Sequence, residues 1–299
     1  MRLCTFVTRT DQENPLVGAV KGGRVFPLKG EGTMIGLIQK GRRPGQAETE
    51  GRGHRLDDIV LKAPVPRPGK ILATIVNTQA MLGGPDIRLD RPRVDMKAPS
   101  TAIGAGETIM APSTGIRPEV ELAAVIGRRL SGGTVAEAKA SIFGFTILND
   151  VTAPSDSRDD AYEAYRRDRS SGIIKRSVMR GPLFRSKNHD TFCPMGPWLV
   201  TKDEVGDWSN LRMTTRFGGM LVQKGSTSEY LFTPERIASY VSGFLSLDEG
   251  DIISCGSVGW TREALGKMDP TEFILPPRDG TLELEIQGLG KLKNRVSFA

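Results

Sequence analysis

Glycine and proline interrupt the sequence so often that they leave room for few long helices. The chain has 35 glycines and 19 prolines in 299 residues. Between them lie short apolar runs, which are KILATIV (70–76), ELAAVIG (121–127), GPWLVT (196–201), DIISCG (251–256) and TLELEIQ (281–287). Short apolar runs bounded by turn residues are typical of strands, so we expect a β-rich α+β fold.

Helices are expected in only three places, at 134–141, 157–169 and 233–247, where Ser157 and Thr233 would cap the last two. A proline-rich stretch, APVPRPGK (63–70), precedes the first strong strand. Such stretches are typical of linkers. We therefore expect a small N-terminal domain over 1–66 and a larger domain over 67–299.

Composition excludes several classes of protein. Hydrophobic residues make up 38% of the chain, and no run approaches the roughly 18 apolar residues of a membrane span. The N-terminus lacks the apolar segment and cleavage site of a secretory signal. Cys4, Cys193 and Cys255 form no CxxC pair, and we expect the last two to be small buried residues. These features indicate a soluble cytoplasmic protein with no membrane partner.

The net charge of +6 raises the question of a nucleic-acid partner. Basic residues are concentrated between Arg158 and Lys187, but stacking candidates there are limited to Tyr162, Tyr165 and Phe184. No nucleic-acid motif accompanies them. We expect a solvated helical face and no nucleic-acid partner, and the alternative would show steep salt-dependent retention on DNA.

The run RPEVELAAVIG (117–127) contains two carboxylates one residue apart, Glu119 and Glu121. In a strand they share a face, and burying both requires protonation or a compensating cation. A hard dication such as magnesium, calcium or manganese prefers such oxygen ligands. Asp150, at the end of the next apolar run, could supply a third ligand. From these residues alone, two glutamates pointing into water remain the alternative.

Seven stretches, in order, connect the chain to a known family. They are KILATIVN, PEVELAAVIGRRL, GFTILNDVTA, SKNHDTFCPMGPWLVTKDEV, LVQKGSTSEYLF, LDEGDIISCGSVG and IQGLGKLKN. From about Lys70 onward the chain resembles the fumarylacetoacetate hydrolase family. The resemblance implies a mixed β-sandwich roll with a small N-terminal domain, a homodimer, and Mg²⁺ or Mn²⁺ bound by Glu119, Glu121 and Asp150.

The same resemblance implies further site residues. Lys187 in SKNHDTF matches the family's active-site lysine, and Lys97 in MKAPST matches a second lysine. Substrate-binding positions are matched by Asn77, Gln223 and Ser257. Without the resemblance, the lysines read as surface residues, Gln223 as a hairpin residue and Ser257 as a turn hydroxyl.

The departures from the family pattern concern the reaction. Hydrolytic members carry a tyrosine followed by an H-x-x-E pair that activates water, but here Thr78, Met81 and Gly84 stand at those positions. Neither Met81 nor Gly84 can accept a proton, so the usual general base is missing. Pro154 replaces an expected arginine. His189 is a candidate base, with a core or turn role as the alternative, and Glu163 in the inserted segment is another.

These observations lead to one hypothesis about function and two alternatives. A dication would hold a small anionic 2-oxo or 2,4-dioxo acid and stabilise its enolate, and Lys187 could move the C3 proton if the metal and burial lower its pKa. The expected reaction is isomerisation or tautomerisation, decarboxylation, or dehydration. The alternatives are a carbon–carbon bond hydrolase of acylpyruvates with a non-standard base, and an inactive metabolite-binding member. The inserted segment, flanked in its second half by Gly172 and Gly181, could act as a lid.

Overall fold

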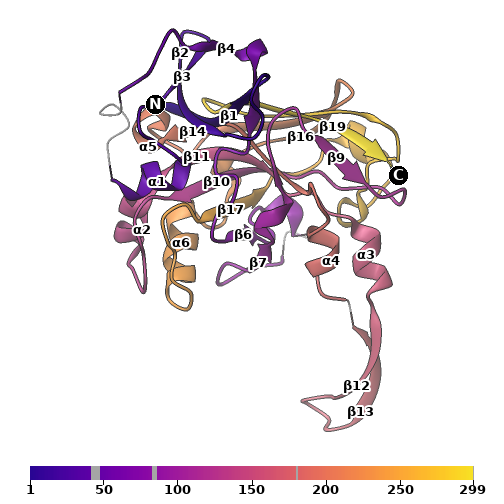
Figure 1. Ribbon diagram of the computed structural model, residues 1–299. Helices are drawn as coiled ribbons and strands as arrows, with labels where there is room; N and C mark the ends of the chain where they lie inside the picture. Colours follow the sequence, from indigo (N-terminus) through magenta and orange to yellow (C-terminus); the bar gives the residue numbers. More distant parts are fainter. Residues whose placement is uncertain (42–47, 83–85, 180, 299) are drawn as a thin grey trace.

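The computed structural model describes residues 1–41, 48–82, 86–179 and 181–298. Its described part is dominated by strands that form two large sheets and one separate hairpin (Figure 1). Both large sheets combine antiparallel and parallel strand pairs. The prediction of a β-rich mixed roll is therefore confirmed.

The larger sheet runs through the middle of the molecule. Its twelve strands, in spatial order, are β4 (His54–Arg55), β3 (Arg24–Pro27), β2 (Leu16–Lys21), β1 (Arg2–Thr8), β14 (Cys193–Thr201), β11 (Ile142–Asn149), β10 (Val120–Ile126), β17 (Ile252–Ser257), β6 (Ile71–Thr74) and β7 (Val94–Lys97), with β5 (Ile59–Lys62) and β8 (Ala102–Ile103) pairing with β1 and β14. Every residue of β10 is buried. All five apolar runs of the sequence lie in strands, four of them in this sheet.

The second sheet contains β16 (Met220–Ser226), β15 (Arg212–Phe217), β18 (Gly280–Ile286), β19 (Gly290–Phe298) and β9 (Thr108–Ala111). The main core lies between the sheets, where Leu122 and Ala124 of β10 join Met213, Leu284 and other apolar side chains. The neighbouring positions Ala123 and Val125 face a second core cluster on the opposite side of β10. The strand therefore alternates between two buried faces, as expected from its period of two.

The helices are short. They are α1 (Met34–Gln39), α2 (Val135–Ser141), α3 (Pro154–Asp159), α4 (Phe184–Lys187), α5 (Lys202–Val205), α6 (Pro234–Ser242) and α7 (Arg262–Leu265). Two expected helices are confirmed as α2 and a shortened α6. Thr134 and Glu137 form a capping box that begins α2. Within the described ranges, every helix is too short or too polar to cross a membrane.

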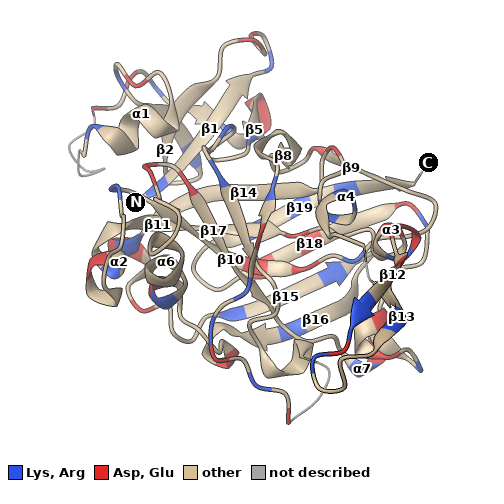
Figure 2. Ribbon diagram, turned by 90° about the horizontal axis from the view of Figure 1, so that it is seen from below, with Lys and Arg blue, Asp and Glu red and all other residues tan. Residues whose placement is uncertain are grey.

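The helix expected over 157–169 is wrong. The helix α3 ends at Asp159, and the chain then forms a β-hairpin from β12 (Tyr162–Arg167) and β13 (Ile174–Met179). The hairpin extends away from the body, while α3 and α4 lie side by side at its base (Figure 1). Both strands of the hairpin contain Lys or Arg residues, which are blue on the ribbon (Figure 2).

The N-terminal segment shares the large sheet with the rest of the chain. Strand β1 pairs with β14, where Arg2 lies opposite Val200 and Leu3 opposite Leu199. Helix α1 packs on the same core cluster as Ala123 and Val125 of β10. Hydrogen bonding thus crosses the boundary expected near residue 66, and the division into two domains stays a prediction.

Candidate active site and metal centre

Three carboxylates converge where β10 and β11 meet. Glu119 and Glu121 belong to the same face of the β10 segment as Ala123, and Asp150 follows β11 directly, opposite Glu119. One oxygen from each carboxylate lies within 4.8 Å of the other two. The exposed fractions of Glu119, Glu121 and Asp150 are 8%, 2% and 2%, which excludes the alternative of glutamates pointing into water.

Strand β17 holds Glu121 in place. Its Oε2 accepts hydrogen bonds from Ser254 Oγ at 2.6 Å and from the backbone N of Gly256 at 2.8 Å. Burial and the nearby carboxylates of Asp150 and Glu119 raise the pKa of Glu121 to about 8. With the protein's own groups alone, Glu121 therefore favours the neutral form near neutral pH.

Gly256 cannot be replaced without moving this arrangement. Its φ is +93°, and an added Cβ would lie 2.5 Å from Asn77 Cβ. Asn77 is itself fully buried, donates to the carbonyls of Phe232 and Cys255, and accepts from Phe232 N. Asn77 thus connects β17 to the segment before α6, and its predicted contact with substrate stays a prediction.

Lys187, at the end of α4, reaches the carboxylates directly. Its Nζ lies 2.5 Å from Asp150 Oδ2 and 3.0 Å from Glu119 Oε2. Burial acts to lower the pKa of Lys187, but the carboxylates of Asp150 and Glu119 outweigh it and raise the pKa above its ordinary value. Burial therefore does not lower the pKa of Lys187 by itself, because the negative charges of the carboxylates outweigh desolvation. A pKa lowered by a bound dication stays a prediction.

Lys97 lies behind Asp150 and is fully buried. Its Nζ is 2.8 Å from Asp150 Oδ1 and donates to the carbonyls of Val151 and Lys187. Burial opposes ionisation of Asp150, yet the ammonium groups of Lys187 and Lys97 keep its pKa below the ordinary value. Lys97 therefore fixes both a carboxylate and the backbone of α4, and its contact with substrate stays a prediction.

Gln223 and Ser257 form a buried pair beside Glu121. Gln223 Nε2 donates to Ser257 Oγ and Val258 O, while its Oε1 accepts from Val120 N and Thr215 Oγ1. Ser257 Oγ in turn donates to Val120 O. Protein groups thus satisfy the Gln223 amide, which leaves Ser257 as the member of the pair that lines the cavity described below.

The two candidate bases lie elsewhere. His189 Nε2 pairs with Asp156 Oδ2, which links the segment after α4 to α3. Glu163, on the exposed hairpin, pairs with Arg176. Neither His189 nor Glu163 is among the described residues that line the acidic cavity. Both are instead committed to contacts that hold the hairpin and its base, and their role as bases stays a prediction.

The positions that depart from the family pattern have structural roles. Thr78 is buried and donates to the carbonyl of Ser257, and Met81 lines the cavity. Pro154 occupies the first turn of α3. Gly84 lies outside the described residues. An apolar side chain thus stands in the cavity where the family's hydrolytic members carry a histidine.

A cavity of about 240 Å³ opens onto the carboxylates. Lys187, Met81 and Ser257 line it, together with two residues that the sequence analysis did not single out, Arg117 and Thr74. Thr74 Oγ1 is buried and has no hydrogen-bond partner among the described residues. The x-R-x-E-x-E spacing could have drawn attention to Arg117, whereas nothing in the sequence distinguishes Thr74.

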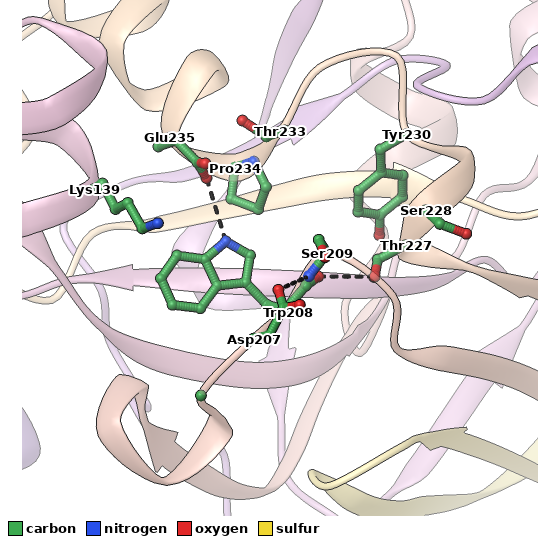
Figure 3. Close-up of a pocket in the computed structure, with 11 residues that line it drawn as sticks. Lys139, Asp207, Trp208, Ser209, Thr227, Ser228, Tyr230, Thr233, Pro234 and Glu235 are labelled. Carbon is green, nitrogen blue, oxygen red and sulfur yellow. Dashed lines mark hydrogen bonds between the residues drawn. The ribbon is translucent and has the colours of Figure 1, made fainter.

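A second cavity, of about 320 Å³, lies between α6 and the segment around Trp208 (Figure 3). It is larger, but it shares no lining residue with the acidic cavity in the described ranges. Trp208 donates to Glu235, and Lys139 Nζ lies 5.2 Å from the Trp208 ring centroid. The converging carboxylates and Lys187 line the acidic cavity, although its volume is smaller. We therefore assign the chemistry to the acidic cavity.

The acidic cavity suits a hard dication. Three buried carboxylates carry up to three negative charges, whereas the two neighbouring lysines supply two positive ones. Oxygen ligands at this separation fit Mg²⁺ or Mn²⁺ better than a soft metal. Glu119, Glu121 and Asp150 would hold the ion, and Ser254 and Gly256 would orient Glu121 from behind.

The class of this protein is indicated by two features, the mixed sheets packed around a core and the buried carboxylates beside Lys187. Residues 77–297 match the family model described as fumarylacetoacetate (FAA) hydrolase C-terminal. The chain belongs to the fumarylacetoacetate hydrolase family, as the resemblance implied.

Three relatives illustrate the range of the family. Oxaloacetate tautomerase FAHD2B, mitochondrial, from Bos taurus is 32% identical over 242 residues, which cover 80% of this chain and 70% of that protein. A 2,4-didehydro-3-deoxy-L-rhamnonate hydrolase from Sphingomonas sp. is 30% identical and covers 78% of this chain and 75% of its own length. The structure of a 5-carboxymethyl-2-hydroxymuconate delta-isomerase from Mycobacterium smegmatis matches with a TM-score of 0.74, 26% identity and full coverage of both chains. Relatives of this kind support an enzyme acting on an acid.

Proposed function

We propose that this protein is a keto–enol tautomerase of a small 2-oxo acid that depends on Mg²⁺ or Mn²⁺. The observation that carries the proposal is a buried carboxylate triad, two members of which pair with Lys187, in a cavity where Met81 stands at the position of a water-activating histidine. The chain has kept the groups that bind and protonate an enolate. It has lost the expected group that would activate water.

The bound dication would supply Lewis acidity toward the adjacent carboxylate and carbonyl oxygens of the substrate. Glu119, Glu121 and Asp150 line one part of the cavity and would hold the dication there, and Ser257 also lines the cavity. Lys187 Nζ donates to two of the three carboxylates, Glu119 and Asp150, and lines the cavity. Without metal, the carboxylates of Asp150 and Glu119 raise the pKa of Lys187, which favours the ammonium form before metal and substrate bind.

In the direction from enol to ketone, proton movements balance as follows. The Lys187 ammonium gives a proton to C3 of the enolate, and the enol hydroxyl proton leaves when the substrate binds as the enolate. Lys187 then regains a proton from solvent. The reverse sequence forms the enol, so one group serves both directions.

Relatives support a tautomerase over the other enolate reactions, because the bovine relative is named an oxaloacetate tautomerase. The second candidate is hydrolysis of a 2,4-dioxo acid, favoured by the name of the Sphingomonas relative. It would need a base outside the described lining of the cavity, such as His189 or Glu163. The homodimer, the absence of a nucleic-acid partner and a cytoplasmic location stay predictions.

The test follows the enol absorbance of a 2-oxo acid such as oxaloacetate as the tautomers interconvert. We expect catalysis that requires Mg²⁺ or Mn²⁺, stops on chelation, and falls by about 100-fold or more in Lys187→Met. Lys224→Met, at an exposed position of β16, is the matched control and should keep its activity. An acylpyruvate incubated in parallel should yield no new carboxylic acid.

Two outcomes would replace the proposal. Carbon–carbon cleavage of the acylpyruvate as fast as tautomerisation would establish the hydrolase. Metal binding with no turnover of any 2-oxo acid tried would indicate the inactive, metabolite-binding member.

A further inference from the structure

Arg117 lies two residues before Glu119, on the same face of the chain as Glu119 and Glu121. An isolated bridge pairs Arg117 with Thr152, in the same register that places Val120 opposite Asn149. Positions 117, 119 and 121 therefore lie on one face of the extended chain. Thr152 lies beside Arg117 in the same way that Asp150 lies beside Glu119. Two residues of extended chain span about 7 Å, so Arg117 begins roughly that far from the nearest metal-site position.

The guanidinium of Arg117 is held by neutral groups. Its Nε donates to Phe273 O at 3.0 Å and its Nη2 to Thr271 O at 2.6 Å. Among the described residues, no ion pair includes Arg117. Arginine has five N–H donors in a planar fork that matches a carboxylate. Since the two carbonyls take two donors, N–H groups remain for an anion, and its side chain lines the acidic cavity.

The rest of the cavity agrees with a ligand that has two polar ends. Thr74 is 2% exposed and lines the cavity. Its Oγ1 has no hydrogen-bond partner among the described residues. A buried hydroxyl without a partner is costly unless a ligand or water satisfies it. The apolar side chains of Met81 and Leu183 line the space as well.

We propose that Arg117 binds the second carboxylate of a dicarboxylic 2-oxo acid, and so makes the site selective for a dianion. This inference rests on the proposed function, because the 2-oxo acid end of the substrate would lie against the acidic triad. A monocarboxylic 2-oxo acid would leave the Arg117 charge facing an apolar chain end. A monocarboxylic acid would therefore bind more weakly, because it lacks the charge-assisted hydrogen bonds to Arg117.

The test uses two ligands that do not react, malate and 2-hydroxybutyrate. They share a carboxylate with an adjacent hydroxyl and differ in a terminal carboxylate against a methyl group. Binding to the Mg²⁺-loaded protein is measured by calorimetry. We expect malate to bind the unaltered protein at least about 10-fold more tightly than 2-hydroxybutyrate, as expected for a hydrogen-bonded charge pair.

Arg117→Met should remove that preference by weakening malate about 10-fold or more while changing 2-hydroxybutyrate by less than about twofold. Arg117→Lys, which keeps the charge without the fork, should retain part of the preference. Arg212→Met on β15 removes the same charge from an exposed position and should leave both affinities unchanged. Thermal unfolding and Mg²⁺ affinity of each variant show whether the site is intact.

The inference is overturned if the unaltered protein fails to bind malate or does not prefer it, or if Arg117→Met weakens both ligands equally. Should Arg117→Met not fold, because it loses the bonds to Thr271 and Phe273, the ratio of the two affinities in Arg117→Lys decides by the same criterion. Neither ligand is turned over. Selectivity is thus measured independently of whether the protein is a tautomerase.

Discussion

At the scale of single residues, the three carboxylates of the site are not equivalent. Asp150 is surrounded by the ammonium groups of Lys97 and Lys187, which favour its ionised form. Glu121 accepts from a hydroxyl and a backbone N–H, and burial favours its neutral form. Glu119 contacts Lys187. A dication would therefore find one carboxylate already ionised and would have to displace a proton from another.

Replacing Glu119 with glutamine should abolish tight metal binding while preserving the shape of the site. Loss of a charged oxygen ligand is expected to weaken Mg²⁺ or Mn²⁺ by more than roughly 100-fold, since even changes behind the ligands cost 10- to 100-fold. Calorimetric titration with each metal measures the effect. Glu283→Gln, on the exposed side of β18, is the control and should bind metal normally. Equal affinities in the two variants would argue against the triad as the metal site.

All three cysteines should be unreactive in the folded protein. Each is buried and unpaired, and burial raises the pKa of Cys4 and of Cys193 to about 12. The pKa of Cys255 is also raised, by burial and by Glu121. A thiol reagent near pH 8 should therefore label none of them until denaturant is added, and then all three. Rapid labelling of one thiol in the native protein would contradict the buried positions.

The residues of the site differ in how readily the sequence reveals them. Glu119, Glu121 and Asp150 stand out because like charges inside apolar runs require compensation. Ser254 and Thr74 do not, since an isolated serine or threonine is ordinary in a strand. Only the register between β10, β11, β17 and β6 brings them to the same point, and that register depends on contacts distant in sequence.

At the scale of elements, the strands were predictable and one helix was not. Short apolar runs between glycines and prolines became strands because burial on both faces of a sheet favours them. The segment YEAYRR was expected to be helical from its charged, helix-favouring residues. It instead pairs with IKRSVM across a turn, Tyr162 lying opposite Met179. The tyrosines suit a strand, and pairing with residues beyond the window decided the outcome.

Excising the hairpin should leave the site intact. Tyr162 and Met179 are directly paired, so a short glycine-containing turn can replace residues 162–179 without moving α3 or α4. Because no described hairpin residue lines the acidic cavity, we expect metal affinity and tautomerase activity to change by less than about twofold, and the melting temperature by less than roughly 3 °C.

The same excision tests the lid suggested by the sequence. A large loss of activity with metal affinity unchanged would mean that the hairpin closes over the bound substrate. As a control for the effect of altering a hairpin, the loop at Gly218 and Gly219, between β15 and β16, is replaced by the same short turn.

At the scale of the whole molecule, the acidic centre should make stability depend on pH and metal together. The folded-state pKa of Glu121 is about 8, against an ordinary value of 4.5. Between these values the folded protein without metal binds more protons than the unfolded chain, so its stability decreases as pH rises through this window. Metal binding requires the ionised carboxylate. The increase in melting temperature caused by Mg²⁺ or Mn²⁺ should thus grow from pH 5.5 to pH 8.

Thermal melts with metal and with chelator, at several pH values, measure this linkage. One proton contributes at most about 1.4 kcal/mol per pH unit. Glu121→Gln cannot titrate, and its metal-free stability should lose the part of the slope that Glu121 contributes. A metal effect that stays constant over the whole range would contradict the raised pKa.

The large sheet contains strands from both sides of the boundary expected between residues 66 and 67, and this limits where the chain can be cut. The family model begins at residue 77, yet β1 covers the outer side of β14 through Leu3 and Arg2. A fragment cut to the family's borders would leave β14 with bare amide and carbonyl groups and uncover apolar side chains such as Leu199, which invites aggregation. We therefore expect a fragment that starts at residue 77 to be less soluble than the full chain, because β1 covers an edge of β14 that the fragment would expose.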